Sequence, residues 1–183
     1  MELDRVDRIT TGAVGDPGRR TFYLQARSGT DLVTVQVEKE QVELLAASIL
    51  EILSRVGKET GEGPDEEELE LEEPLEPRWR VGRLSIGYEE DRDLILLELE
   101  ELVLQEEEEE EAEGEGEDKV PAFAGPDPEV VRLRATREQM LALSRHGAAV
   151  AARGRPLCQL CGNPIDPEGH ICPAMNGHAR PST

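Results

Sequence analysis

The stretch from Asp31 to Val42, DLVTVQVEKEQV, changes its hydrophobic period part-way along and so indicates how this chain folds. Apolar side chains alternate at Val33, Val35 and Val37, which is the pattern of a strand with one buried face. Helical spacing then takes over, in a stripe made of Val42, Leu45, Ala46, Ile49, Leu50 and Leu53. The segment therefore predicts a strand that leads directly into an amphipathic helix.

A similar stretch, EVVRLRATREQM, lies 98 positions later, from Glu129 to Met140. Its apolar residues alternate at Val131, Leu133 and Ala135, and a thinner stripe follows at Met140, Leu143, Ser144, Gly147, Ala148 and Ala151. A Glu-Gln pair recurs at the strand-to-helix switch of both copies, where a negative charge suits the positive end of the helix dipole. Thr136, three residues before Gln139, predicts a capping box.

Hairpin patterns precede both strand-helix segments. The first covers residues 8–15 and 21–26, and the second covers residues 80–87 and 94–99. Together these patterns predict an α+β fold in which two duplicated β-β-β-α units form one antiparallel sheet with two helices packed on it.

The organisation along the chain follows from this plan and from the charge. We assign a first half at 1–56, an acidic linker at 57–77, a second half at 78–153 with an acidic insert at 105–119, and a tail at 154–183. Residues 58–76 and 105–119 each carry a charge of −9 out of the net −21, so the remainder carries only −3. Repulsion between like charges predicts extended, solvated chain in both acidic segments. The net charge also argues against non-specific nucleic-acid binding.

The tail contains all three cysteines of the chain and two of its three histidines. Cys158-x-x-Cys161 followed by Gly162 has the form of a zinc knuckle, because glycine permits the tight turn that two thiolates need to close on one ion. Cys172 supplies a third sulfur. His170 is the favoured fourth ligand, and His178 is the alternative. Three thiolates and one imidazole suit Zn²⁺, and a filled four-ligand site is structural.

Two other interpretations of the tail stay open. Cys158 and Cys161 are also spaced as a redox pair, although such a motif is typical of a strand-to-helix junction rather than a tail rich in Pro and Gly. A site with only three protein ligands would be catalytic, with Asp166 and Glu168 as the nearby acids.

The rest of the chain offers little catalytic chemistry. It contains neither a P-loop nor a Gly-x-Ser-x-Gly elbow, and His146 falls within the second predicted helix. No stretch approaches the roughly 20 apolar residues of a membrane-spanning helix. The first residues lack the features of a signal peptide, and clustered Cys and His fit a reducing compartment. We therefore expect a cytoplasmic protein.

Several motifs resemble those of a known family. They are Asp7-Arg8 followed by GxVGxPGxRTFxLQAR from Gly12 to Arg27, the EKxQ switch at Glu38–Gln41, and the ending CxxCGxPxDPxGHxCP from Cys158. They are similar to an uncharacterised family of actinobacterial and related bacterial proteins, often encoded near mycothiol biosynthesis genes and a phosphomutase-like protein. The resemblance implies Cys158, Cys161, His170 and Cys172 as the matching tail residues. It implies no activity, and the insert at Glu106–Asp118 departs from the family pattern.

The sequence thus favours a non-enzymatic interaction or regulatory protein that is stabilised by zinc and binds a protein partner. One alternative is an enzyme or a binder of a small anionic ligand, which would use the loops 12–18 and 87–93 and an arginine strip. The strip comprises Arg19, Arg20, Arg27, Arg78, Arg80 and Arg83. The other alternative is a zinc protein associated with nucleic acid.

Overall fold

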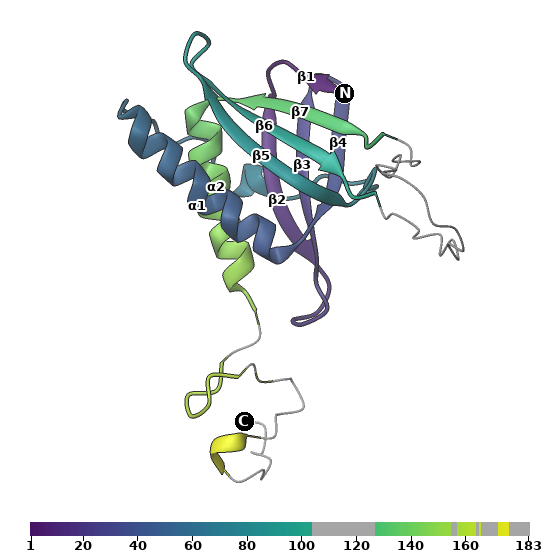
Figure 1. Ribbon diagram of the computed structural model, residues 1–183, viewed down its shortest axis with the longest axis vertical. Helices are drawn as coiled ribbons and strands as arrows, with labels where there is room; N and C mark the ends of the chain where they lie inside the picture. Colours follow the sequence, from purple (N-terminus) through teal and green to yellow (C-terminus); the bar gives the residue numbers. More distant parts are fainter. Residues whose placement is uncertain (104–126, 155–156, 164, 166–171, 176–183) are drawn as a thin grey trace, which may run out of the picture.

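The described residues form seven strands, two α-helices and two short 3-10 helices. The computed structural model describes residues 1–103, 127–154, 157–163, 165 and 172–175 (Figure 1). The elements are β1 (Glu2–Leu3), β2 (Arg8–Val14), β3 (Thr21–Ser28), β4 (Asp31–Val37), α1 (Lys39–Val56), η1 (Glu66–Leu69), β5 (Val81–Glu89), β6 (Leu94–Glu101), β7 (Val130–Ala135), α2 (Arg137–Ala152) and η2 (Pro173–Met175). The α+β class and both predicted helices are confirmed. The acidic insert 105–119 lies outside the described residues.

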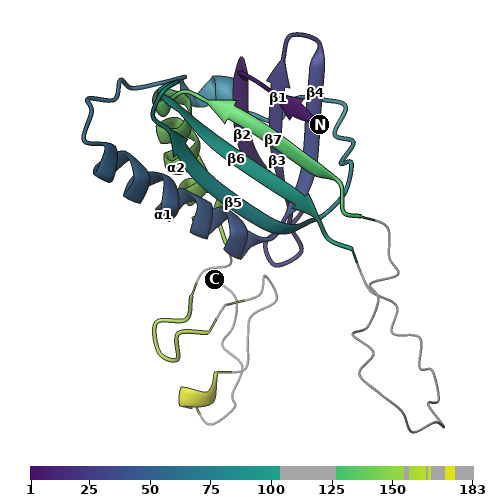
Figure 2. The same ribbon diagram turned by 45° about the horizontal axis from the view of Figure 1, so that its top comes forward.

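The strands form two sheets, so the prediction of one antiparallel layer is wrong. One sheet has the order β2-β3-β4 and the other β1-β7-β6-β5, and β1 pairs with β7 in parallel. In Figures 1 and 2, β5, β6 and β7 lie across the front of β2, β3 and β4, with both helices at one side. Apolar residues of both sheets belong to one buried cluster. Two facing sheets bury each other's apolar sides. In a single wide sheet, the two helices alone would have to cover the apolar side.

Backbone hydrogen bonds join the two sheets at two places, one before β5 and one before β2. The Gln36 amide of β4 donates to the Trp79 carbonyl just before β5 (2.9 Å), and Gln36 forms a parallel bridge with Arg80. The Val6 amide, just before β2, donates to the Arg134 carbonyl of β7 (2.8 Å). Each three-stranded meander therefore begins beside the last strand of the other meander.

Both helices start in the same way. The predicted capping box at Thr136 and Gln139 is confirmed, and Glu38 and Gln41 form a second one at α1. Each of these glutamines also donates its side-chain amide to the other half, Gln41 to the Val81 carbonyl (3.1 Å) and Gln139 to the Val6 carbonyl (3.1 Å). The recurring glutamine thus caps its helix and fixes the start of the opposite meander.

The small residues of α2 allow close packing against α1 and β2. Ser144 is buried and donates to the Ala46 carbonyl of α1 (2.8 Å). A Cβ atom on Gly147 would lie 3.2 Å from the Thr11 side chain and 3.3 Å from Val42. Most predicted helix positions face the core, but Leu50 and Ala148 are exposed.

Residues 66–76 of the acidic linker, here called the strap, pack on the sheet of β2, β3 and β4. This differs from the solvated chain that the charge predicts. Leu69 is only 4% exposed, and a Cβ atom on Gly12 would come within 2.6 Å of Leu71. The Thr10 hydroxyl donates to the Leu69 carbonyl. The burial of Leu69 and the hydrogen-bond partners of the backbone outweigh the repulsion between neighbouring glutamates.

The Gln25 side chain and two arginines hold the strap in place at Glu72. Gln25, which is 1% exposed, donates to the Glu72 carbonyl (2.9 Å) and accepts from the Glu72 amide (2.8 Å). Arg8 and Arg27 lie 2.6 and 3.3 Å from the Glu72 carboxylate. The segment that appeared to be a linker is therefore part of the folded body.

Candidate metal centre

A tight turn presents the first two cysteines. The Cys158 amide donates to the Asn163 carbonyl (2.8 Å), and the Gly162 amide donates to the Cys158 carbonyl (2.8 Å). Gly162 has φ +74°, a left-handed conformation that glycine adopts without steric cost. The turn that the sequence predicts after the second cysteine is therefore present, and it brings Cys158 and Cys161 to one side.

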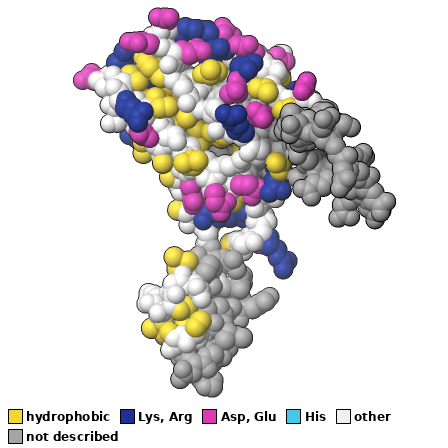
Figure 3. Space-filling view, viewed as in Figure 1, with side chains coloured by type: hydrophobic (Ala, Val, Ile, Leu, Met, Phe, Trp, Pro, Cys, Tyr) yellow, Lys and Arg dark blue, Asp and Glu magenta, His cyan; other side chains and the backbone are white. Residues whose placement is uncertain are grey.

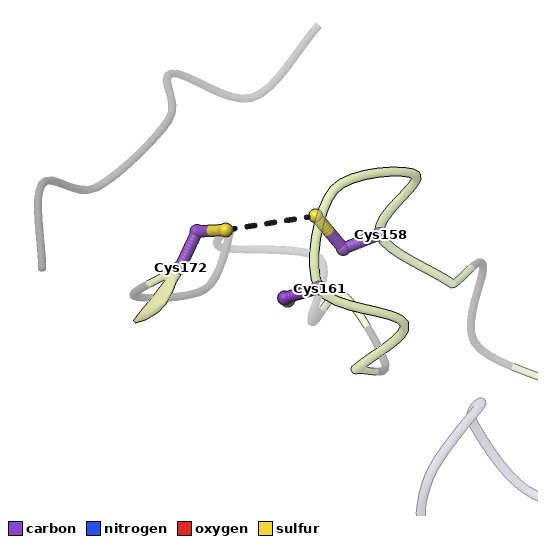
Figure 4. A group of neighbouring side chains, drawn as sticks. All are labelled: Cys158, Cys161 and Cys172. Atoms are coloured by element: carbon purple, nitrogen blue, oxygen red, sulfur yellow. Dashed lines mark hydrogen bonds between the residues drawn. The ribbon is translucent and has the colours of Figure 1, made fainter. Parts of the chain in front are cut away.

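The third cysteine approaches from a separate segment. The Sγ atoms of Cys158, Cys161 and Cys172, here called the cysteine cluster, all lie within 4.8 Å of one another. Figure 4 shows Cys172 facing Cys158, with 3.9 Å between their sulfurs. Four sulfurs at about 2.3 Å from a tetrahedral zinc ion would lie about 3.8 Å apart. The spacing fits ligands of one ion, whereas a disulfide would require about 2.05 Å.

Burial and backbone amides shape the electrostatics of the cluster. Cys158 and Cys172 are buried and Cys161 is partly exposed. The backbone amides of Cys161 and then Leu160 lower the pKa of the Cys158 thiol to about 6. The Asn163 amide acts to lower the pKa of Cys161, but burial and the neighbouring sulfurs outweigh it and leave that pKa raised. The lowered pKa of Cys158 favours its thiolate, which is the form that binds metal.

The other predicted tail residues are not among those that the structure describes. His170 and His178 lie outside the described residues, and so do Asp166 and Glu168. The structure thus brings together three of the four predicted ligands. His146, the remaining histidine, is partly buried on α2, where burial lowers its pKa.

The predicted arginine strip is largely engaged in contacts within the protein. Arg20 donates to the Val150 carbonyl (3.2 Å) and lies over the Phe22 ring. Arg27, Arg78 and Arg80 pair with Glu72, Glu129 and Glu38, while Arg19 and Arg83 are exposed. On the face in Figure 3, acidic and basic side chains lie interspersed. Within the described chain, the strip is not a continuous basic surface.

A shallow depression lies at the start of α2, and part of its lining comes from the predicted ligand loop 87–93. Its charged lining is Arg5, Arg92, Asp93, Arg137 and Glu138. Arg92 pairs with Asp4 (2.7 Å) and Arg137 with Asp93 (3.1 Å), so two of its three arginines already have carboxylate partners. These residues come from three separate segments, of which only the loop 87–93 was predicted as a place for ligand binding.

The family is clear from a comparison of the whole chain with known families. Residues 1–172 match the family described as protein of unknown function (DUF3090). The chain belongs to this family. No curated protein and no solved structure matches it. The match includes Cys158, Cys161, His170 and Cys172, and it ends before His178.

Among the residues that the structure describes, no helix has both the length and the apolar character needed to cross a membrane.

Proposed function

We propose that the cysteine cluster binds one structural zinc ion, with His170 as the fourth ligand. The convergence of three sulfurs from two separate segments, all within 4.8 Å, carries this proposal. Soft thiolates favour zinc over Mg²⁺ or Ca²⁺, which prefer oxygen ligands. His170 lies within the matched residues 1–172, whereas His178 lies beyond them.

A zinc ion with four protein ligands stabilises the fold and keeps no position open for water or substrate. Such an ion would contribute folding free energy to a tail that has few apolar residues of its own. The role fits the place of the cluster, which lies in the tail beyond α2 (Figure 1). The fourth ligand distinguishes this closed site from the redox and three-ligand alternatives.

We further propose that this is a cytoplasmic, non-enzymatic interaction or regulatory protein, in which the zinc tail and the body present a surface for a protein partner. Leu157 and Leu160, which flank Cys158, are 64% and 50% exposed. Exposed apolar side chains close together on one turn suit protein contact. No specific observation favours either alternative function. Most arginines of the strip have partners, which argues against an anionic-ligand site, and the net charge of −21 argues against nucleic-acid binding.

We also infer that the two halves derive from a duplicated β-β-β-α unit. The order β2-β3-β4-α1 recurs as β5-β6-β7-α2. Gln41 and Gln139 cap their helices and bind the opposite meander in the same manner. Two unrelated segments would have no reason to share this non-local contact.

Single histidine substitutions test the zinc proposal. His170→Gln should lower zinc affinity by more than about 10-fold, which is the effect of losing even an outer partner of a ligand. His146→Gln on α2 and His178→Gln are the matched controls and should retain wild-type affinity, measured by competition with a chelating dye. If all three variants bind zinc equally, His170 is not a ligand.

The interaction proposal has a separate test. The full-length protein at native expression should recover a protein partner in affinity purification, and a Leu157→Ser, Leu160→Ser double variant with normal zinc content should lose it. Recovery of the same partner by the double variant would place the interface elsewhere.

A further inference from the structure

The cysteine cluster has a second chemical option besides metal binding, and this inference rests on the zinc site proposed above. Cys158 and Cys172 face each other in Figure 4, their sulfurs are 3.9 Å apart, and no disulfide joins them. A disulfide needs about 2.05 Å between its sulfurs, so an approach of about 2 Å joins them. Cys158 lies on the turn that includes Gly162, and Cys172 lies on a separate segment, so the approach moves one segment toward the other.

We propose that zinc and a Cys158–Cys172 disulfide are mutually exclusive states of the tail, so that a peroxide switches the protein from a zinc-bound to a zinc-free form. Two of the three clustered sulfurs would be consumed by the disulfide. Cys161 and one histidine are too few ligands to hold a structural zinc ion. The bond would also close a loop between positions 14 residues apart, so the oxidised tail would keep a covalent link where it loses the ion.

The reaction balances with hydrogen peroxide as the oxidant. One sulfur, as thiolate, attacks an oxygen of the peroxide, the O–O bond breaks, and a sulfenic acid and water form after protonation. The second thiolate attacks the sulfenic sulfur, and the hydroxyl leaves as water with a second proton. Two thiolates, one peroxide and two protons thus give one disulfide and two waters. A dithiol reverses the change by exchange.

The chain allows a clear assignment of the disulfide. Residues 156–179 contain no Lys or Arg, so trypsin leaves all three cysteines in one peptide, whereas a glutamate-specific protease cuts after Glu168. That cut separates Cys172 from Cys158 and Cys161 unless a disulfide joins them. Cys161→Ser and Cys158→Ser, which each remove one of the two sulfurs on the same side of the cut, then identify the partner of Cys172.

The experiment treats full-length, reduced protein with hydrogen peroxide after its zinc content has been measured. We expect about one zinc ion released per disulfide formed, recovery of zinc binding after dithiothreitol, and linked fragments in wild type and Cys161→Ser but not in Cys158→Ser. Fragments that separate in oxidised wild type, or zinc that stays bound after the disulfide forms, would overturn the proposal. Protein purified without zinc would refute the zinc site itself, and its peroxide reaction would still test the pairing.

Discussion

Substitution of Gln25 by alanine tests whether the acidic strap belongs to the folded body. The Gln25 side chain forms three hydrogen bonds of 2.8 to 3.0 Å, one with Thr34 and two with the backbone of Glu72. Alanine leaves the amide and carbonyl of Glu72 without these partners, and each unsatisfied group costs about 1–3 kcal/mol when water cannot replace the lost bond. Because the Glu72 side chain is 35% exposed, some water can enter, and we expect a loss of about 2–4 kcal/mol.

Urea unfolding followed by circular dichroism gives the stability, and hydrogen exchange with mass spectrometry gives the protection of residues 66–76. Gln36→Ala is the matched control, since Gln36 lies on β4 and is partly exposed. It should change the free energy of unfolding by less than about 0.5 kcal/mol. A Gln25 variant as stable as this control, with unchanged exchange in the strap, would show that the strap is not held as described.

Two further predictions concern the body. Gly147→Leu should destabilise the protein by about 1–3 kcal/mol, because its side chain must displace Thr11 or Val42, and Ala148→Leu on the exposed side of α2 should be nearly neutral in the same urea titration. Asp93 accepts hydrogen bonds from Tyr88, Arg137 and Lys58, which lower its pKa below the ordinary value of 3.8. The Asp93 carboxylate therefore contributes its full stabilisation above pH 3.8. This stabilisation is lost as the pH falls further, because the carboxyl then binds a proton more readily in the unfolded chain than in the folded chain. The difference in melting temperature between wild type and Asp93→Asn should accordingly be larger at pH 6 than at pH 3, and asparagine also tolerates the positive φ of 54° at this position. A difference that grows towards pH 3 would contradict this sign.

Local patterns in the sequence predict the individual elements well. The alternation at Val33, Val35 and Val37 and the switch near Gln41 depend on neighbouring residues alone, so the strand and helix could be placed from them. The turn at Gly162 is predictable for the same reason, since it depends on one glycine beside two cysteines.

Long-range pairing explains what the sequence did not predict. The division into two sheets depends on contacts such as Val6 with Arg134 and Gln36 with Trp79, which no local period encodes. β1 has only two residues and exists through its pairing with β7. In the strap, acidic composition concealed Leu69, whose burial depends on a surface formed by distant strands.

The zinc content of the purified full-length chain tests the central claim most directly. Plasma mass spectrometry on reduced wild type should find about one zinc ion per chain, and Cys158→Ser and Cys172→Ser should each lose most of it while the body keeps its helical circular dichroism signal. Wild type with no zinc at equimolar supply, or serine variants that retain a full equivalent, would contradict a structural zinc ion held by the cysteine cluster.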